Sequence, residues 1–198
     1  MIEEILLLCD PLLEAELTDV LHAANPDLTV SVIHNRADLA ARCAVALHKT
    51  RLVSFGSDVI VPAAVLEALD CGAYNFHPGP PSYPGRFPST FFIEDGGRLF
   101  GSTVHEMAAQ VDSGPINAVD RFEVPADLHC VDLNLLSFHS LLALFKKLVP
   151  HLAVDEAPLA RTDAVWSGRT TTQRDFDALC RLPSDVDAEA FQRRLRAV

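Results

Sequence analysis

The sequence predicts one α/β domain with a doubly wound, mainly parallel sheet and helices on both of its faces. Three observations lead to this fold class. Short apolar runs alternate with helical patterns along residues 4–77, as in successive βαβ units. Hydrophobic residues make up 49% of the chain and charged residues 22%, which is typical of a globular protein. A length of 198 residues suits one domain with a short appendage.

The strands and helices of the first part follow from their residue patterns. Strands are predicted where apolar or β-branched residues form a short continuous run, and these ranges are 4–9, 28–34, 51–56 and 73–77. Helices are predicted where apolar residues recur at three- and four-residue spacing, at 11–24, 36–49 and 62–72. Pro62 and Gly72 mark the two ends of the last helix.

The pattern changes after residue 86. We expect a helix, two strands, a long amphipathic helix and two short helices, at 87–97, 100–107, 116–125, 131–152, 172–181 and 187–196. Because the chain turns polar at Asp155, residues 1–154 are predicted to form the main domain and residues 155–198 a helical extension packed on it. The last helix has no stop signal before Val198, so we expect a longer natural chain.

Charge and cysteine content narrow the classes of partner. The formal net charge of −11 would repel a phosphate backbone, so nucleic acid is not an expected partner. The five cysteines form no C-x-x-C pair, which disfavours a zinc site or a disulfide framework. The N-terminus carries acids where a signal peptide needs basic residues, and no apolar run is long enough for a bilayer. A cytoplasmic protein without a membrane partner is therefore predicted.

The stretch "YNFHPGPPSYPG" (74–85) places two polar side chains at the end of a predicted strand. Asn75 and His77 are two residues apart, so on a strand they point to the same side. The prolines and glycines that follow prevent the strand from continuing. Ligands of doubly wound sheets bind at such carboxyl ends. Taken alone, however, the stretch favours a turn with a satisfied histidine.

A second stretch, "GSTVHEMAAQVDSGPI" (101–116), adds a histidine and a carboxylate. It places His105 on a strand and Asp112 in a loop bounded by Gly114 and Pro115, a bend that can aim the carboxylate at a neighbouring strand. The first strand is not followed by G-x-G-x-x-G, which argues against an ordinary dinucleotide binder.

Together these stretches resemble the folate-dependent formyltransferases, the family of glycinamide ribonucleotide transformylase and methionyl-tRNA formyltransferase. That family carries Asn-x-His near a strand end, then Gly-x-Thr-x-His, then an aspartate in an Asp-x-Gly-x-Ile turn. The matching residues, within roughly residues 50 to 125, are Asn75, His77, Gly101, Thr103, His105, Asp112, Gly114 and Ile116. The resemblance implies a Rossmann-like formyltransferase fold and transfer of a formyl group from 10-formyltetrahydrofolate to an amine.

The resemblance makes Asn75, His77 and Asp112 the catalytic residues. Formyl transfer passes through a tetrahedral oxyanion, and one fixed hydrogen-bond donor to such an anion contributes about 3 kcal/mol. Asn75 and His77 would supply donors, while Asp112 would orient the imidazole and raise its pKa for proton transfer. No metal is expected. His105 is interpreted as a supporting rather than a catalytic histidine.

The same register predicts the binding residues. The segment "DVIVP" (58–62) matches the part of the family that contacts the pterin ring, and the loop before Asp112 would form the opposite wall. The predicted cofactor-binding residues are Val59, Ile60, Val61, Gln110, Val111 and Gly114. Tyr83, Arg86 and Ser89 are predicted to face the acceptor, although packing or solvation of their loop explains them equally well.

The acceptor is predicted to be a small-molecule amine. The segment after the first strand, "CDPLLEAEL" (9–17), has three acids and no glycine, so it is not suited to cradle a ribose phosphate. The basic surfaces expected of a tRNA-binding member are also missing. An amino-sugar nucleotide or another amine metabolite remains. The alternatives are a formyltetrahydrofolate hydrolase and a non-catalytic folate- or metabolite-binding regulator, and a homodimer is left open.

The C-terminal stretch offers two ambiguous features. Arg161, Arg169 and Arg174 could pair with an anionic acceptor, but solvated charges that balance nearby aspartates are the favoured interpretation. Trp166, the single tryptophan, is expected to pin the extension to the domain rather than to stack on an acceptor.

Overall fold

A computed structural model describes residues 1–198. It contains one six-stranded sheet with the strand order β2-β1-β3-β4-β5-β6. The strands are β1 (Glu4–Leu8), β2 (Thr29–Ile33), β3 (Thr50–Phe55), β4 (Ala73–His77), β5 (Leu99–Glu106) and β6 (Ile116–Glu123). The first four run parallel, whereas β5 and β6 are antiparallel to their neighbours. The predicted doubly wound, mainly parallel sheet is therefore confirmed, with a hairpin added at one edge.

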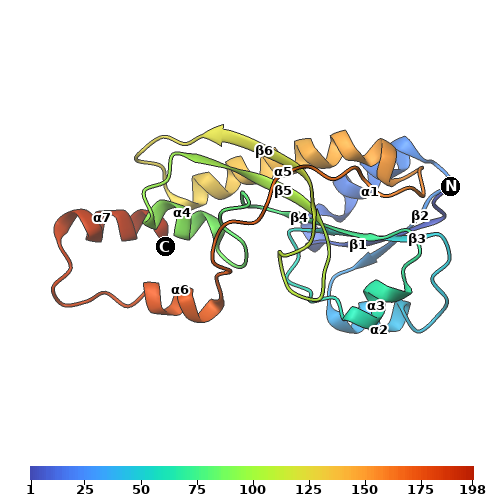
Figure 1. Ribbon diagram of the computed structural model, residues 1–198, viewed down its shortest axis with the longest axis horizontal. Helices are drawn as coiled ribbons and strands as arrows, with labels where there is room; N and C mark the ends of the chain where they lie inside the picture. Colours follow the sequence, from blue (N-terminus) through green and yellow to red (C-terminus); the bar gives the residue numbers. More distant parts are fainter.

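Helices cover both faces of the sheet (Figure 1). The long helix α5 (Cys130–Leu152) and α1 (Glu14–Ala24) lie on one face, and the short helices α2 (Arg36–Arg42) and α3 (Ala63–Ala68) lie on the other. The remaining helical elements are η1 (Pro11–Leu13), α4 (Pro88–Glu94), α6 (Gln173–Leu179) and α7 (Ala188–Ala197). None of the helices combines the length and apolar character that crossing a bilayer requires.

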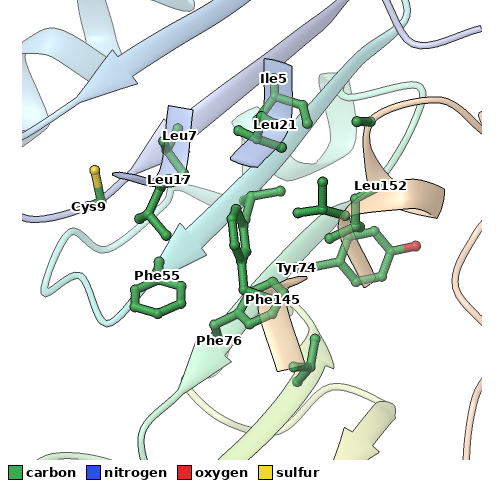
Figure 2. Packing of buried hydrophobic residues seen from close by; sticks show 14 of the residues in the cluster. Ile5, Leu7, Cys9, Leu17, Leu21, Phe55, Tyr74, Phe76, Phe145 and Leu152 are labelled. Carbon is green, nitrogen blue, oxygen red and sulfur yellow. The ribbon is translucent and has the colours of Figure 1, made fainter. Parts of the chain in front are cut away.

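Two cores explain why the first strand is apolar throughout. Alternate side chains of β1 enter opposite layers: Ile5 and Leu7 pack toward α1 and α5, while Leu6 and Leu8 pack toward α2. Figure 2 shows the larger layer, in which aromatic rings from β3, β4 and α5 meet. The ring of Phe145 lies edge-on to Phe55 at 5.6 Å and to Phe76 at 5.4 Å, a favourable geometry for aromatic pairs.

Strand register brings the two sequence motifs together. In the antiparallel pair β4–β5, Asn75 lies opposite His105 and His77 lies opposite Thr103. Thr103 also donates a hydrogen bond of 2.7 Å from Oγ1 to the carbonyl oxygen of Gly79. The start of the proline-rich loop is thereby fixed to β5, beside the polar end of β4.

One predicted helix is much shorter than expected. The helical pattern at 36–49 forms a helix only to Arg42, because the chain must turn back to enter β3. Lys49 takes a positive φ of 46°. The N–H groups of Lys49 and Thr50 donate to the Asp70 carboxylate at 2.7 and 3.0 Å. These bonds hold the return segment in place of a further helical turn.

The C-terminal segment runs back over the domain instead of forming a layer of its own (Figure 1). Arg51, fully buried on β3, ties down its beginning by donating to the carbonyl oxygens of Leu152 at 2.7 Å and Ala157 at 3.0 Å. Further on, α7 packs against α4 and pairs Arg194 with Glu94 at 2.5 Å. A division of the chain at residue 154 stays a prediction.

Candidate active site

The polar side chains of the two motifs form one cluster at the end of the sheet. Asn75 and His77 come from the last residues of β4 and His105 from β5, while Asp112 comes from the loop between β5 and β6. Asp112 has a positive φ of 45°, a conformation that aspartate tolerates better than most residues. The predicted turn thus aims the Asp112 carboxylate back at the strand ends.

Asp112 is the centre of the cluster because four polar groups surround its carboxylate. Oδ2 accepts the backbone N–H of Gly85 at 2.7 Å and lies 3.4 Å from Nδ1 of His77. Oδ1 lies 3.1 Å from Nε2 of His105 and 3.4 Å from Nδ2 of Asn75. Burial raises the pKa of Asp112, but the hydrogen bond from His105, the charge of His77 and the Gly85 N–H outweigh it and lower this pKa to about 2. The carboxylate is therefore ionised at neutral pH.

His77 lies between two hydrogen-bond acceptors. Its Nε2 is 2.9 Å from the carbonyl oxygen of Tyr83, and its Nδ1 faces Asp112. Both ring nitrogens can donate at once only in the imidazolium form. Burial lowers the pKa of His77, while Asp112 and the Tyr83 carbonyl oppose this shift and His105 adds to it. The net effect is a lowered pKa, which favours the neutral ring that a general base requires.

His105 positions the Asn75 carboxamide. Its Nδ1 lies 2.8 Å from the carbonyl oxygen of Glu106, and its Nε2 lies 3.2 Å from Nδ2 of Asn75. Asn75 Nδ2 donates to Oδ1 of Asp112 at 3.4 Å and lies against Nε2 of His105, and this nitrogen can accept from Asn75 only in the tautomer in which it does not donate to Asp112. This supporting geometry fits the interpretation of His105 made from the sequence.

A small cavity of about 70 Å³ opens beside Asn75, between residues 59–61 and the loop before Asp112. Its lining includes five of the six predicted cofactor-binding residues, namely Val59, Ile60, Val61, Gln110 and Val111. Apolar walls beside polar groups suit a flat heterocycle such as a pterin. The volume is well below the roughly 300 Å³ of small-molecule sites, so the two walls must separate to admit one.

Gly114, the sixth predicted cofactor-binding residue, is not part of this lining. A Cβ atom at Gly114 would lie 1.9 Å from the carbonyl oxygen of Glu106, so the glycine allows two backbone segments to approach each other. Its own carbonyl oxygen accepts a hydrogen bond of 2.9 Å from Nε1 of Trp166. In this structure Gly114 allows the Asp112 loop to pack closely against β5.

A second, larger cavity of about 540 Å³ lies on the other side of the cluster. Its walls are residues 56–58, 85–88 and 170–173. It shares Ser57, Ile60, Asn75, Val111 and Asp112 with the small cavity. Asn75 and Asp112 therefore lie where the two cavities meet, accessible from both.

The three residues predicted to face the acceptor have different surroundings. Arg86 lines the larger cavity. The ring of Tyr83 instead packs edge-on against Phe92 at 5.7 Å, and its burial raises the pKa of the phenol to about 12. Ser89 is only 2% exposed. Tyr83 and Ser89 thus lie outside the lining of this cavity: Tyr83 turns toward Phe92 of α4, and Ser89 is buried in the first turn of α4 itself.

Sequence patterns did not indicate the wall formed by residues 170–173. The only signal there is the capping pair of Thr172 and Asp175, which marks a helix start and not a cavity. Trp166 anchors this segment, as expected. Arg161 pairs with Glu106 at 2.7 Å, and Arg169 pairs with Asp175 at 2.6 Å, so both arginines balance nearby acids as the favoured interpretation had it.

Comparison with known proteins identifies the family of the chain. A family model for formyl transferases matches residues 48–135. The dTDP-4-amino-4,6-dideoxyglucose formyltransferase of Mycobacterium tuberculosis is 31% identical over 171 residues, which cover 82% of this chain and 69% of the relative.

Solved structures show the same fold. A likely sugar N-formyltransferase from Mycobacterium tuberculosis superposes with a TM-score of 0.79 at 25% identity, covering 100% of this chain and 87% of that one. An N-formyltransferase from Helicobacter canadensis, solved with folinic acid and dTDP-3-aminofucose, gives a TM-score of 0.76 at 18% identity, covering 100% of this chain and 80% of that one. With the sequence relatives, these findings establish that the chain belongs to the folate-dependent formyltransferase family.

Proposed function

We propose that the protein transfers the formyl group of 10-formyltetrahydrofolate to the amino group of a sugar nucleotide. The observation that carries the proposal is the position of Asn75 and Asp112 at the junction of the two cavities. A donor in the smaller cavity and an amine in the larger one would meet at these side chains. Effective transfer needs the two reacting groups to be held together in this way.

The residues of the cluster are suited to three tasks. Asn75, which both cavities reach, would donate a hydrogen bond to the formyl oxygen as that oxygen becomes anionic. His77 and the ionised Asp112 form a buried pair that would take up the proton released by the attacking amine. His105 would hold the side chains of Asn75 and Asp112 in a fixed position relative to each other. 10-Formyltetrahydrofolate supplies the one-carbon group.

The acceptor class is supported by the larger cavity and by the relatives. Arg86 on its wall offers a planar donor set to the diphosphate of a sugar nucleotide. The relatives include the dTDP-4-amino-4,6-dideoxyglucose formyltransferase, so this sugar nucleotide is the first acceptor to test. A cytoplasmic location and a homodimer also stay predictions, the latter to be tested by light scattering of the purified protein.

The test is an assay for N-formylated sugar nucleotide by mass spectrometry. Purified protein is incubated with 10-formyltetrahydrofolate and dTDP-4-amino-4,6-dideoxyglucose, beside the variants Asn75→Ala, His77→Ala and Asp112→Asn. We expect product with the wild type and a loss of at least about 100-fold in each variant, with unchanged circular dichroism. Full activity in any of the three would refute its catalytic role.

Two further outcomes separate the alternatives. Formate released from the donor without dependence on an amine would favour the hydrolase. Calorimetric binding of a stable donor analogue, without turnover of any amine tested, would favour the regulator.

A further inference from the structure

Trp166 contacts both histidines of the catalytic cluster and the loop that carries Asp112, although it lies about fifty residues further along the chain than Asp112. Its ring lies edge-on to the ring of His105, with centroids 5.0 Å apart, and to that of His77, with centroids 5.8 Å apart. Its indole Nε1 donates to the carbonyl oxygen of Gly114 at 2.9 Å. One side chain therefore touches the ends of β4 and β5 and the loop that carries Asp112.

The residues after Trp166 bind the other loop of the site. The N–H of Ser167 donates to the carbonyl oxygen of Pro81 at 3.0 Å, and the N–H of Thr171 donates to that of Pro84 at 3.0 Å. The N–H of Arg86 donates in return to the carbonyl oxygen of Thr171 at 2.9 Å. Gly168 is required here, since a Cβ atom would lie 1.8 Å from the carbonyl oxygen of Ser82. We call residues 166–171 the clamp.

The loop that the clamp holds supplies two of the contacts that define the cluster. The carbonyl oxygen of Tyr83 lies against Nε2 of His77, and the N–H of Gly85 donates to Asp112. The clamp is hydrogen-bonded on both sides of these residues, at Pro81, Pro84 and Arg86. It therefore joins the proline-rich loop to the Asp112 loop, and Trp166 lies at the join.

We propose that Trp166 is a positioning residue for catalysis: its ring fixes the orientation of His77 and His105 and shields both imidazoles from water. The proposal rests on the proposed function for its kinetic readout. Loss of the ring would leave the histidines free to rotate and open the cluster to solvent. Contacts of this kind around reacting groups commonly change rates by one to two orders of magnitude.

The kinetic test uses Trp166→Ala and Trp166→Phe, with Val165→Ala as the control because the Val165 side chain is 72% exposed. We expect kcat to fall roughly 10- to 100-fold in Trp166→Ala, with the donor KM changed by less than about 3-fold. Trp166→Phe keeps a ring over the histidines and should recover most of kcat. The control should match the wild type.

The pH profile of kcat distinguishes positioning from a general structural effect. Asp112 and His105 are the titratable groups that face His77, and neither residue is substituted in Trp166→Ala. Water that enters in place of the ring would relieve the burial that lowers the pKa of His77, so the acidic limb of the profile should move to higher pH. A folded Trp166→Ala variant with wild-type kcat and an unchanged profile would overturn the proposal.

A spectroscopic test does not depend on activity or on the folding of a Trp166 variant. Protonated imidazole quenches indole fluorescence on contact, and Trp166 is the only tryptophan. The wild-type emission should therefore show a step as His77 is protonated, below the ordinary histidine pKa of about 6.5 because burial lowers the pKa of His77, and this step should be lost in His77→Gln. An emission profile that is the same in the wild type and in His77→Gln, followed down to the pH of acid unfolding, would refute the contact and with it the proposal. If the step is present but no amine is formylated, the proposed function fails instead.

Discussion

The close contact between the proline-rich loop and the clamp can be tested at a single glycine. Gly85 has a φ of +95°, and a Cβ atom there would lie 2.3 Å from the carbonyl oxygen of Thr171. Gly96 is a matched control, with a φ of +66° and no atom within 4 Å of a Cβ. Both substitutions by alanine force a side chain into a conformation that favours glycine. Only Gly85→Ala also pushes two chain segments apart.

The expected difference follows from the contacts that are lost. Gly96→Ala should cost about 1 kcal/mol of unfolding free energy, the price of a left-handed alanine. Gly85→Ala adds the loss of the two backbone bonds between Thr171 and its partners Pro84 and Arg86, each about 1 kcal/mol. A total of about 3 kcal/mol or more is expected. Because the Gly85 N–H also reaches Asp112, kcat should fall roughly 10-fold or more.

Urea unfolding followed by circular dichroism measures the first quantity, and formyl transfer measures the second. Gly96→Ala should keep wild-type kcat, since it lies far from the cluster on the loop after α4. Equal stability of the two variants would refute the contact between the loop and the clamp. A stable Gly85→Ala with full activity would refute its link to the catalytic carboxylate.

Three further predictions concern the cavities and the buried histidine. The Arg86–Asp58 ion pair of 3.0 Å joins two exposed side chains, so Asp58→Asn should change the free energy of unfolding by less than about 1 kcal/mol. The same variant should lower the KM of an anionic acceptor, because it frees Arg86. Arg86→Met should raise that KM roughly 10-fold. Ile60 is 63% exposed at the edge of both cavities, so Ile60→Asp should raise the donor KM in steady-state assays without loss of stability. The pKa of His77 is lowered in the folded protein, so the unfolded chain binds a proton at His77 more readily than the folded protein does. The free energy of unfolding should therefore fall as the pH drops below about 6.5. Urea titrations at pH 7 and pH 5 should show a smaller decrease in His77→Gln than in the wild type.

The fold was predictable because its four central strands, β1, β3, β4 and β5, are buried on both faces over most of their length. An apolar run such as "EILLLC" is most readily accommodated as a buried strand in a chain of this length. Apolar residues at helical spacing then identify the helices that cover the sheet. The helix predicted at 36–49 was too long, because local propensity does not register that Asp70 binds the backbone at Lys49 and Thr50 from twenty residues away. Such a distant side chain leaves no periodic trace in the sequence.

The centre of the site was predictable for a different reason. Asn75, His77 and Asp112 belong to motifs with fixed spacing, and strand pairing alone brings Asn75 opposite His105. The walls were less accessible to prediction. Tyr83 lies in the predicted loop, yet its ring turns inward to an aromatic cluster. Thr171 joins the site through its backbone and its hydroxyl, which bind Pro84 and Arg86, and these partners lie some 85 residues away in the sequence.

The two cavities share a wall, and this has a consequence for the order of events during turnover. Ile60 and Val111 line both spaces, and the smaller space must widen before a pterin can enter. Movement of these side chains toward the donor changes the shape of the space that the acceptor enters. Binding of the two substrates is then not independent, because the acceptor enters a pocket whose shape depends on the bound donor. The reaction should therefore follow a sequential rather than a ping-pong scheme, with one substrate completing the pocket of the other.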